Sequence, residues 1–423
     1  MDVRLKVLCV ACAFVVATNV STAHGQGYGT DLQNIMTPAA GGMAGVSIAQ
    51  PQDVPAAIGG NPATLTQFKG TQFTLGGGWI EGYPTISNDG SLNGGTPFHV
   101  TSRTEGFVAP EMGVTQNLNC LGMPATFGMG LSSLSGMGAE YRGRAPGTIL
   151  NNFSSEYLVL GVTAGVGVEL TDRLSVGAST MLGTAFEQLG FVGPIVGSAM
   201  VNAYGLRGTV GATYALNNCN TLGAFWQSQM DFQFPDAIRV NGTYNDLDVD
   251  QPNTFGLGLA NHAFMDGNLL ISTDVYYKLW EDAALWRDVL VNQWVFAVGT
   301  QYTCGSYKYR LGYSYNTDPI NHNVGSNLDG FPVGQQNVLL FQAGSTPLVY
   351  QNRLTFGIGK EGVLIPNLDA DLFAGVLFKG TESFGPDTTA SLALYYVGMG
   401  LTWKFGDCSP RPCDYCPGCP RCE

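Results

Sequence analysis

Charged residues are scarce in this sequence of 423 residues. Asp, Glu, Lys and Arg make up 12% of it, with 19 Lys and Arg against 32 Asp and Glu. About a quarter of a typical soluble domain is charged, so this composition argues against an ordinary soluble protein. The net charge of −13 also argues against nucleic acid as a partner, because that interaction needs basic patches.

Catalytic signatures and long apolar runs are lacking as well. The chain has four histidines and neither a G-x-S-x-G nor an H-E-x-x-H motif, so no enzyme, cofactor or metal centre is indicated. Residues 357–362 match G-x-G-x-x-G, but they end a predicted strand and open no helix, which favours a chance match. Beyond the N-terminus no run of about 18 apolar residues occurs, and this excludes a transmembrane helix.

The N-terminus is typical of an exported protein. Arg4 and Lys6 precede an apolar run over 7–17, and a small-residue stretch ends at Gly25. This pattern predicts a secretory signal peptide at residues 1–25 and a mature chain from near Gln26. An exported chain without a membrane helix is periplasmic, released or an outer-membrane barrel.

Strict alternation of side chains favours the barrel. Over residues 307–316, Tyr and Leu occupy every odd position, and Lys308 and Arg310 lie on the other face. A cation facing lipid near the midplane costs about 2–4 kcal/mol, so these two side chains, and Arg207 by the same test, are predicted to face the lumen. The segment 391–405 alternates in the same way and ends in a terminal Phe.

Alternation predicts an all-β fold, a transmembrane antiparallel barrel of about fourteen strands within residues 69–405. The predicted strands are 70–80, 98–118, 123–133, 157–170, 173–184, 203–216, 221–234, 254–263, 269–281, 292–303, 307–316, 351–361, 368–379 and 391–405. An even count places both termini on the periplasmic side of a bacterial outer membrane, with short turns there and long loops outside.

Residues 26–68 do not alternate and are rich in Gly, Ala and Pro. Their polarity is too low for a disordered arm. Two interpretations remain open: a hatch (plug) folded inside the lumen, or a periplasmic extension.

Several segments, in this order, resemble the FadL-type family of long-chain fatty-acid and hydrocarbon transporters. They are 41–45 (GGMAG), 60–65 (GNPATL), 70–72 (GTQ), 127–131 (FGMGL), 207–216 (RGTVGATYAL), 276–280 (YYKLW) and 310–315 (RLGYSY). The resemblance covers roughly residues 28–405.

The resemblance implies a fourteen-stranded barrel closed by an N-terminal hatch that carries the motif Asn61, Pro62 and Ala63. It also implies that a hydrophobic ligand enters from the outer loops and leaves sideways beside a kinked third strand. The matching kink here lies at Ser133, Ser135 and Gly136, where the family often has Pro-Phe-Gly and this chain departs from it.

The expected function is therefore outer-membrane transport of hydrophobic compounds, either long-chain fatty acids or aromatic or aliphatic hydrocarbons. The expected partners are outer-membrane lipid, the hydrophobic ligand and the barrel-assembly machinery. Arg207, Lys308 and Arg310 are candidates to bind a ligand carboxylate or to pair with lumen acids. A general diffusion porin and a structural envelope barrel remain alternatives.

Eight cysteines follow the predicted signal peptide, and all are expected at the periplasmic end. Three lie in predicted turns and five in a Cys-rich tail at 406–423: Cys120, Cys219, Cys304, Cys408, Cys413, Cys416, Cys419 and Cys422. In that oxidising compartment disulfides persist, so disulfides within the tail or between tail and turns are favoured. Zinc binding by the C-x-x-C spacings and cross-linking to an envelope partner are the other interpretations.

Overall fold

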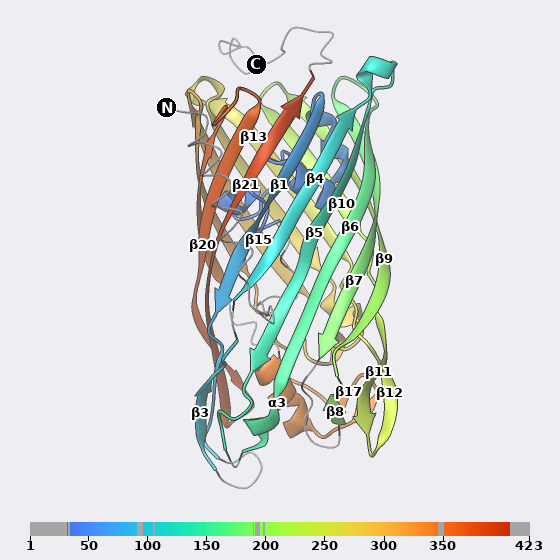
Figure 1. The fold of residues 1–423 in the computed structure, drawn as a ribbon, viewed down its shortest axis with the longest axis vertical. Coiled ribbons are helices and arrows are strands. Elements are labelled where there is room, and N and C mark those ends of the chain that lie inside the picture. The colour runs from blue at the N-terminus through green and yellow to red at the C-terminus, as the bar shows by residue number, and fades with distance from the viewer. Residues whose placement is uncertain are drawn as a thin grey trace.

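A computed structural model of the protein shows a closed antiparallel β-barrel of fourteen strands (Figure 1). The structure describes residues 32, 34–90, 96–104, 106–146, 148–188, 190, 195–197, 199–345 and 351–406. The predicted signal peptide and Cys408, Cys413, Cys416, Cys419 and Cys422 lie outside the described residues.

Each barrel strand pairs with its neighbour in the chain order. The strands are β1 (Thr71–Gly82), β4 (Phe107–Asn117), β5 (Ala125–Glu140), β6 (Ser154–Glu169), β7 (Leu174–Gln188), β9 (Val201–Asn217), β10 (Asn220–Gln227), β13 (Thr254–Phe264), β14 (Leu269–Lys278), β15 (Gln293–Cys304), β16 (Tyr307–Asn316), β19 (Asn352–Lys360), β20 (Leu368–Phe384) and β21 (Thr388–Phe405). The first strand closes the ring against the last, with Thr71 opposite Phe405. Closure pairs the first strand with the last, so neither end of the sheet is left as a free edge.

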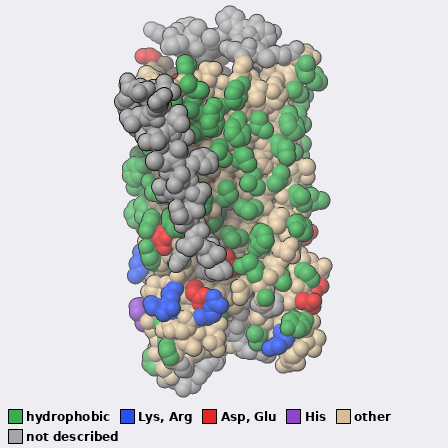
Figure 2. Space-filling view, viewed as in Figure 1, with side chains coloured by type: hydrophobic (Ala, Val, Ile, Leu, Met, Phe, Trp, Pro, Cys, Tyr) green, Lys and Arg blue, Asp and Glu red, His purple; other side chains and the backbone are tan. Residues whose placement is uncertain are grey.

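The predicted alternation of faces is confirmed in the wall. On β16, Tyr309 and Leu311 are 48% and 47% exposed, whereas Arg310 between them is 5% exposed. Figure 2 shows apolar side chains covering the outer surface of the wall, with charged side chains gathered beyond them near the long loops. The outer face is therefore the apolar one, as a lipid-facing surface requires.

Several predicted strand boundaries are wrong, and three of them bear on the site. The predicted strand 98–118 is interrupted after β3 (Phe98–Thr101), because residue 103 bonds to the Glu140 carbonyl instead of continuing the ladder. The predicted strand 221–234 ends with β10, since Met230 and Phe232 turn into a buried cluster. The third barrel strand continues to Glu140, because β6 pairs with it along that whole length.

The two ends of the barrel differ. At one end, called the short-turn end, turns such as 170–173 and 305–306 join the strands, and the described chain leaves the barrel there after β21. The other end, the long-loop end, carries additional strands and helices. They are β2 (Thr85–Asn88), β3, β8 (Ile195–Gly197), β11 (Gln233–Val240), β12 (Thr243–Asp248), β17 (Asn327–Leu328), β18 (Phe331–Pro332), α3 (Gln335–Ser345), η4 (Ile149–Asn152), η6 (Trp280–Asp282) and η7 (Trp286–Asp288).

Long loops fold together into an apolar cap at this end. Its fully buried side chains include Tyr157, Phe232, Trp280, Trp286 and Phe341. Helix α3 lies across the barrel near this end (Figure 1). Among the described residues, no helix has the length and apolarity to cross a bilayer. The short helices η3 (Asn119–Leu121) and η5 (Met265–Gly267) lie in turns of the opposite end.

The segment before β1 lies inside the barrel. It contains η1 (Ala40–Met43), α2 (Val54–Gly59) and η2 (Pro62–Gln67). Helix η1 contacts β15, β16, β19 and β20, while α2 and η2 contact β1, β4, β5, β6, β7 and β9, so the wall surrounds this segment. We call the described residues 32 and 34–68 the hatch.

Candidate functional site

Inward-facing glycines allow the hatch to approach the wall closely. An added Cβ on Gly177 would lie 2.4 Å from the Pro62 backbone, and one on Gly223 would lie 2.3 Å from the Ile48 carbonyl oxygen. Contacts this short are not tolerated by ordinary side chains. The small residues that alternate with apolar ones along the strands therefore create the space that the hatch fills.

The predicted hatch motif fixes the hatch to the wall. The Asn61 amide donates to the carbonyls of Ile48 at 2.8 Å and Ala212 on β9 at 3.1 Å, and its oxygen caps η2 by accepting from the Ala63 N–H. Pro62 is the first residue of that helix, a position that suits proline because no N–H is needed there. Asn61 thus links two parts of the hatch with a barrel strand.

Other polar contacts hold the hatch on the opposite side. Asp274 on β14 accepts from the N–H groups of Ser47 and Ile48, at 2.7 and 3.1 Å. Arg353 on β19 donates to the Ala44 carbonyl at 3.1 Å. Within the hatch, Asp53 accepts three backbone N–H bonds and joins η1 to α2. Because buried backbone groups need partners, these bonds define the position of the hatch.

The ladder between β4 and β5 is interrupted. The two strands pair from Asn117 and Thr126 up to Met112 and Leu131, and no further. Beyond that point β4 remains paired with β1 and β5 remains paired with β6. The wall therefore contains a seam, between 107–111 and 132–140, where the ladder hydrogen bonds of two neighbouring strands are missing.

The predicted kink residues lie along this seam. A β-bulge between Ser133 and Ser135 places Leu134 as an extra residue opposite β6. The Leu134 carbonyl accepts from the N–H of Leu32, the first described residue, at 2.8 Å. An added Cβ on Gly136 would lie 2.3 Å from the ring of Phe107 across the seam. The bulge in β5 therefore lies beside the seam and is hydrogen-bonded to the start of the hatch.

An apolar cluster lines the lumen beside the seam. It combines the hatch residues Leu32, Ile35 and Met36 with wall residues from β1, β4, β20 and β21, namely Ile80, Phe107, Ala109, Phe373, Leu377, Leu392, Leu394 and Tyr396. Leu158 packs against it. Sequence reasoning missed this cluster, because nothing in the alternation of single strands says which inward side chains meet.

The three candidate lumen cations do not form one site. Arg310 pairs with Asp371 at 2.5 Å and Lys308 with Glu361 at 2.8 Å near the short-turn end. Arg207 donates to Gln227 and to the Pro252 carbonyl, close to the cap. The Arg310–Asp371 pair and the Lys404–Asp369 pair face a polar cavity of about 180 Å³ beneath the hatch. Lys308 and Arg310 on β16 thus each have an acidic partner in the wall.

Two cysteines in turns of the short-turn end differ in their bonding. Cys219 is disulfide-bonded, whereas Cys304 is free and exposed. The sequence favours disulfides within the tail or between the tail and the turns, rather than between two turns. The pairing of the tail cysteines stays a prediction.

No protein-family model and no curated protein matches the sequence. Solved structures do match. The toluene transporter TodX of Pseudomonas putida gives a TM-score of 0.63 at 18% identity, over 90% of this chain and 99% of that one. A FadL homologue of Pseudomonas aeruginosa gives a TM-score of 0.65 at 14% identity, over 90% of this chain and 100% of that one.

The toluene transporter TbuX of Ralstonia pickettii gives a TM-score of 0.60 at 18% identity, over 91% of this chain and 100% of that one. These matches extend over nearly the whole length of each neighbour. At such identities they show the fold, which is that of the FadL-type outer-membrane barrels.

Proposed function

We propose that this chain is a FadL-type transporter of the bacterial outer membrane, and that it passes hydrophobic compounds from the long-loop end to the bilayer through the β4–β5 seam. The proposal places both termini in the periplasm. Its central support is the seam itself: the ladder ends at Met112 and Leu131, and apolar side chains of the hatch pack behind it.

A straight path along the barrel axis does not suit an apolar ligand. The hatch occupies the lumen, and beneath it lies a polar cavity lined by Asp53, Lys308, Arg310 and other charged residues. Returning a chain of about fifteen methylenes to water would cost roughly 12 kcal/mol. Sideways release into lipid avoids this cost, and the interrupted ladder provides the place for it.

One observation favours an acidic ligand over a pure hydrocarbon. The hydroxyl of Tyr396 and Nε of Arg353 are buried and have no hydrogen-bond partner among the described residues. Arg353 lies close enough to act electrostatically on Tyr396, which belongs to the apolar cluster at the seam. A carboxylate in the cluster would supply the acceptor that both groups lack.

The test combines binding with uptake. Purified protein is titrated with a long-chain fatty acid and with toluene, and uptake of each is measured in cells that lack their own channel. Deletion of Leu134 removes the bulge in the β5–β6 ladder and should let β5 straighten toward β4. Uptake should therefore fall while binding persists. Deletion of Lys379, in the bulge of β20, is the matched control.

Two results would contradict the proposal. If neither compound binds, the proposed transport function is wrong. Undiminished uptake by the Leu134 deletion would contradict the lateral exit through the seam, but it would not contradict ligand binding.

A further inference from the structure

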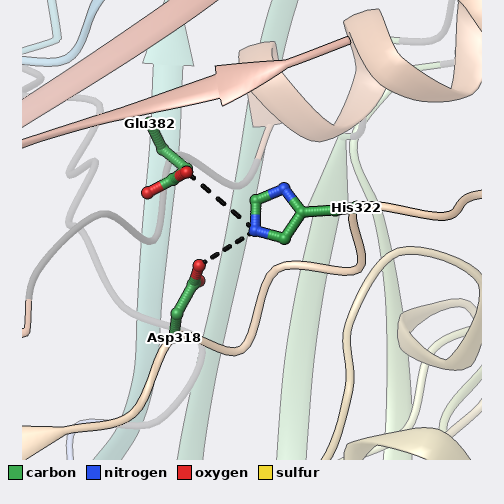
Figure 3. A group of neighbouring side chains, drawn as sticks. All are labelled: Asp318, His322 and Glu382. Atoms are coloured by element: carbon green, nitrogen blue, oxygen red, sulfur yellow. Dashed lines mark hydrogen bonds and ion pairs between the residues drawn. The ribbon is translucent and has the colours of Figure 1, made fainter.

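Three metal-binding side chains meet at the long-loop end of the barrel, away from the hatch and the seam. Asp318 and His322 belong to the β16–β19 connection, and Glu382 lies near the end of β20 (Figure 3). One ligand atom from each lies within 4.8 Å of the others. Because these segments are distant in the chain, only the fold brings the three together.

Both carboxylates approach the same ring nitrogen. Nε2 of His322 is 3.1 Å from Oδ2 of Asp318 and 3.9 Å from Oε1 of Glu382, and Figure 3 shows both interactions converging on that atom. A protonated ring has one N–H at Nε2, which can point at only one acceptor. A metal ion on the lone pair of this nitrogen would be shared by all three groups.

The spacing suits a small transition-metal ion. With metal–ligand distances of about 2.0–2.2 Å, the ligand atoms of a tetrahedral zinc site lie roughly 3.4 Å apart. The distance from Nε2 of His322 to Oδ2 of Asp318 is already close to this value. A small rotation of the Glu382 side chain would bring its Oε1 to a similar distance from Nε2. A mixed nitrogen and oxygen set with few carboxylates favours zinc and similar ions over calcium.

The loop that carries two of the ligands is firmly held. Oδ1 of Asp318 accepts from the Ile320 N–H at 2.9 Å, which leaves Oδ2 directed at His322. The Asn321 N–H donates to the Val289 carbonyl, and Gln342 on α3 donates to the carbonyls of Val289 and Asn321. The ligand loop is thus continuous with the helix that lies across the barrel.

We propose that Asp318, His322 and Glu382 bind a divalent transition-metal ion such as Zn²⁺. The ion fastens the β16–β19 connection, including α3, to β20 and so holds the cap closed. All three side chains are partly exposed, so the ion can enter from solvent and keep a water ligand. Metal binding is independent of the transport proposal.

Zinc binding by the purified full-length protein tests the site. The protein is depleted with a chelator, its free thiols are blocked with iodoacetamide, and it is then dialysed against Zn²⁺. We expect His322→Ala to lose one zinc ion per chain relative to the wild type. Glu382→Gln should weaken that binding by about tenfold or more.

His99→Ala is the matched control, since His99 is also exposed on the long-loop end but bonds to Ser87. It should retain the zinc. Equal zinc content in the wild type and His322→Ala would overturn the site.

Hydrogen exchange of the described residues 318–345 provides the second readout. Zinc should slow exchange there in the wild type and leave it unchanged in His322→Ala. If zinc binds through His322 without slowing exchange, the fastening role is wrong. Fatty-acid and toluene binding, measured separately, report on the transport proposal alone.

Discussion

The Ser133 N–H donates to Oε1 of Glu111 at 3.0 Å, in the place where a continuous ladder would offer it a backbone carbonyl. The Ser133 hydroxyl donates to the Pro110 carbonyl at 3.1 Å. Side-chain bonds thus close the seam at the point where the β4–β5 ladder ends. Such bonds can open without breaking the ladders that hold β4 to β1 and β5 to β6.

Removing the Glu111 acceptor should loosen the seam. Glu111→Ala leaves the Ser133 N–H without its partner, which should lower the local opening free energy by about 1–2 kcal/mol, roughly a tenfold faster exchange. Hydrogen exchange of peptides covering 130–140 measures this. Thr115→Ala, on the paired part of β4, is the control and should leave the exchange unchanged. Equal exchange in Glu111→Ala and the wild type would contradict a closing role for Glu111.

Crowding the hatch motif should open the barrel. An added Cβ on Gly211 would lie 2.0 Å from Oδ1 of Asn61, so Gly211→Ala should displace the hatch and raise single-channel conductance in planar bilayers. Gly208 is on the same strand and has nothing within 4 Å of an added Cβ. Gly208→Ala should therefore conduct like the wild type, and similar currents from both variants would argue against hatch displacement.

Breaking the buried Arg310–Asp371 pair should be costly. Asp371→Asn leaves the Arg310 guanidinium, whose side chain is 2% exposed, without its counter-charge, at a cost of roughly 3 kcal/mol in unfolding free energy. The exposed pair Lys69–Glu169 offers the comparison. Lys69→Met should change stability by less than about 1 kcal/mol. Urea unfolding in detergent measures the free energy of unfolding of both variants. Equal losses in the two would contradict the expected difference between the buried and the exposed pair.

Tyr396 should distinguish an acid from a hydrocarbon. Tyr396→Phe removes a hydroxyl donor and keeps the ring that packs in the apolar cluster. A neutral donor to a carboxylate contributes about 1–2 kcal/mol, so fatty-acid affinity should fall roughly tenfold while toluene affinity stays the same. Titration of the purified variant with both compounds measures this. Parallel losses for the two ligands would exclude a carboxylate contact.

The cap should tighten as the pH falls. Burial raises the pKa of Asp250 above its ordinary 3.8 and nearby Asp231 adds to this, against hydrogen bonds from Ala284, Phe232 and Gln229. The folded chain therefore takes up this proton at a higher pH than the unfolded chain. Its stabilising contribution is fully present below about 3.8 and is lost as the pH rises through the folded pKa.

Hydrogen exchange of residues 229–253 against pH measures that effect. Asp250→Asn, which cannot ionise, should flatten the profile. A profile with the same slope in the variant would assign the titration to another group.

Much of the wall could be predicted from the sequence, because alternation is a local property. Each lipid-facing residue such as Tyr309 is two positions from the next, and the opposite face carries Arg310 and small residues. Counting such runs yields fourteen strands and the outward face of each. The inward glycines were visible, but their contact with the hatch depends on which strands surround it.

The seam and the cap could not be predicted in this way. Their formation depends on where pairing stops, and that is decided between strands rather than within one. Residues 123–133 alternate well, yet β5 extends past the bulge because β6 provides its partner there. The approach of Glu382 to His322 depends on the path of a long loop, for which alternation has no information.

The pairing of Thr71 with Phe405 has a consequence for assembly. The hatch leads directly into β1, and β1 completes the cylinder only when β21, the last strand, meets it. The closed wall surrounds the hatch on all sides, and the cap covers the long-loop end. Because the hatch precedes β1 and β1 pairs with the last strand, the step that completes the wall is also the step that encloses the hatch.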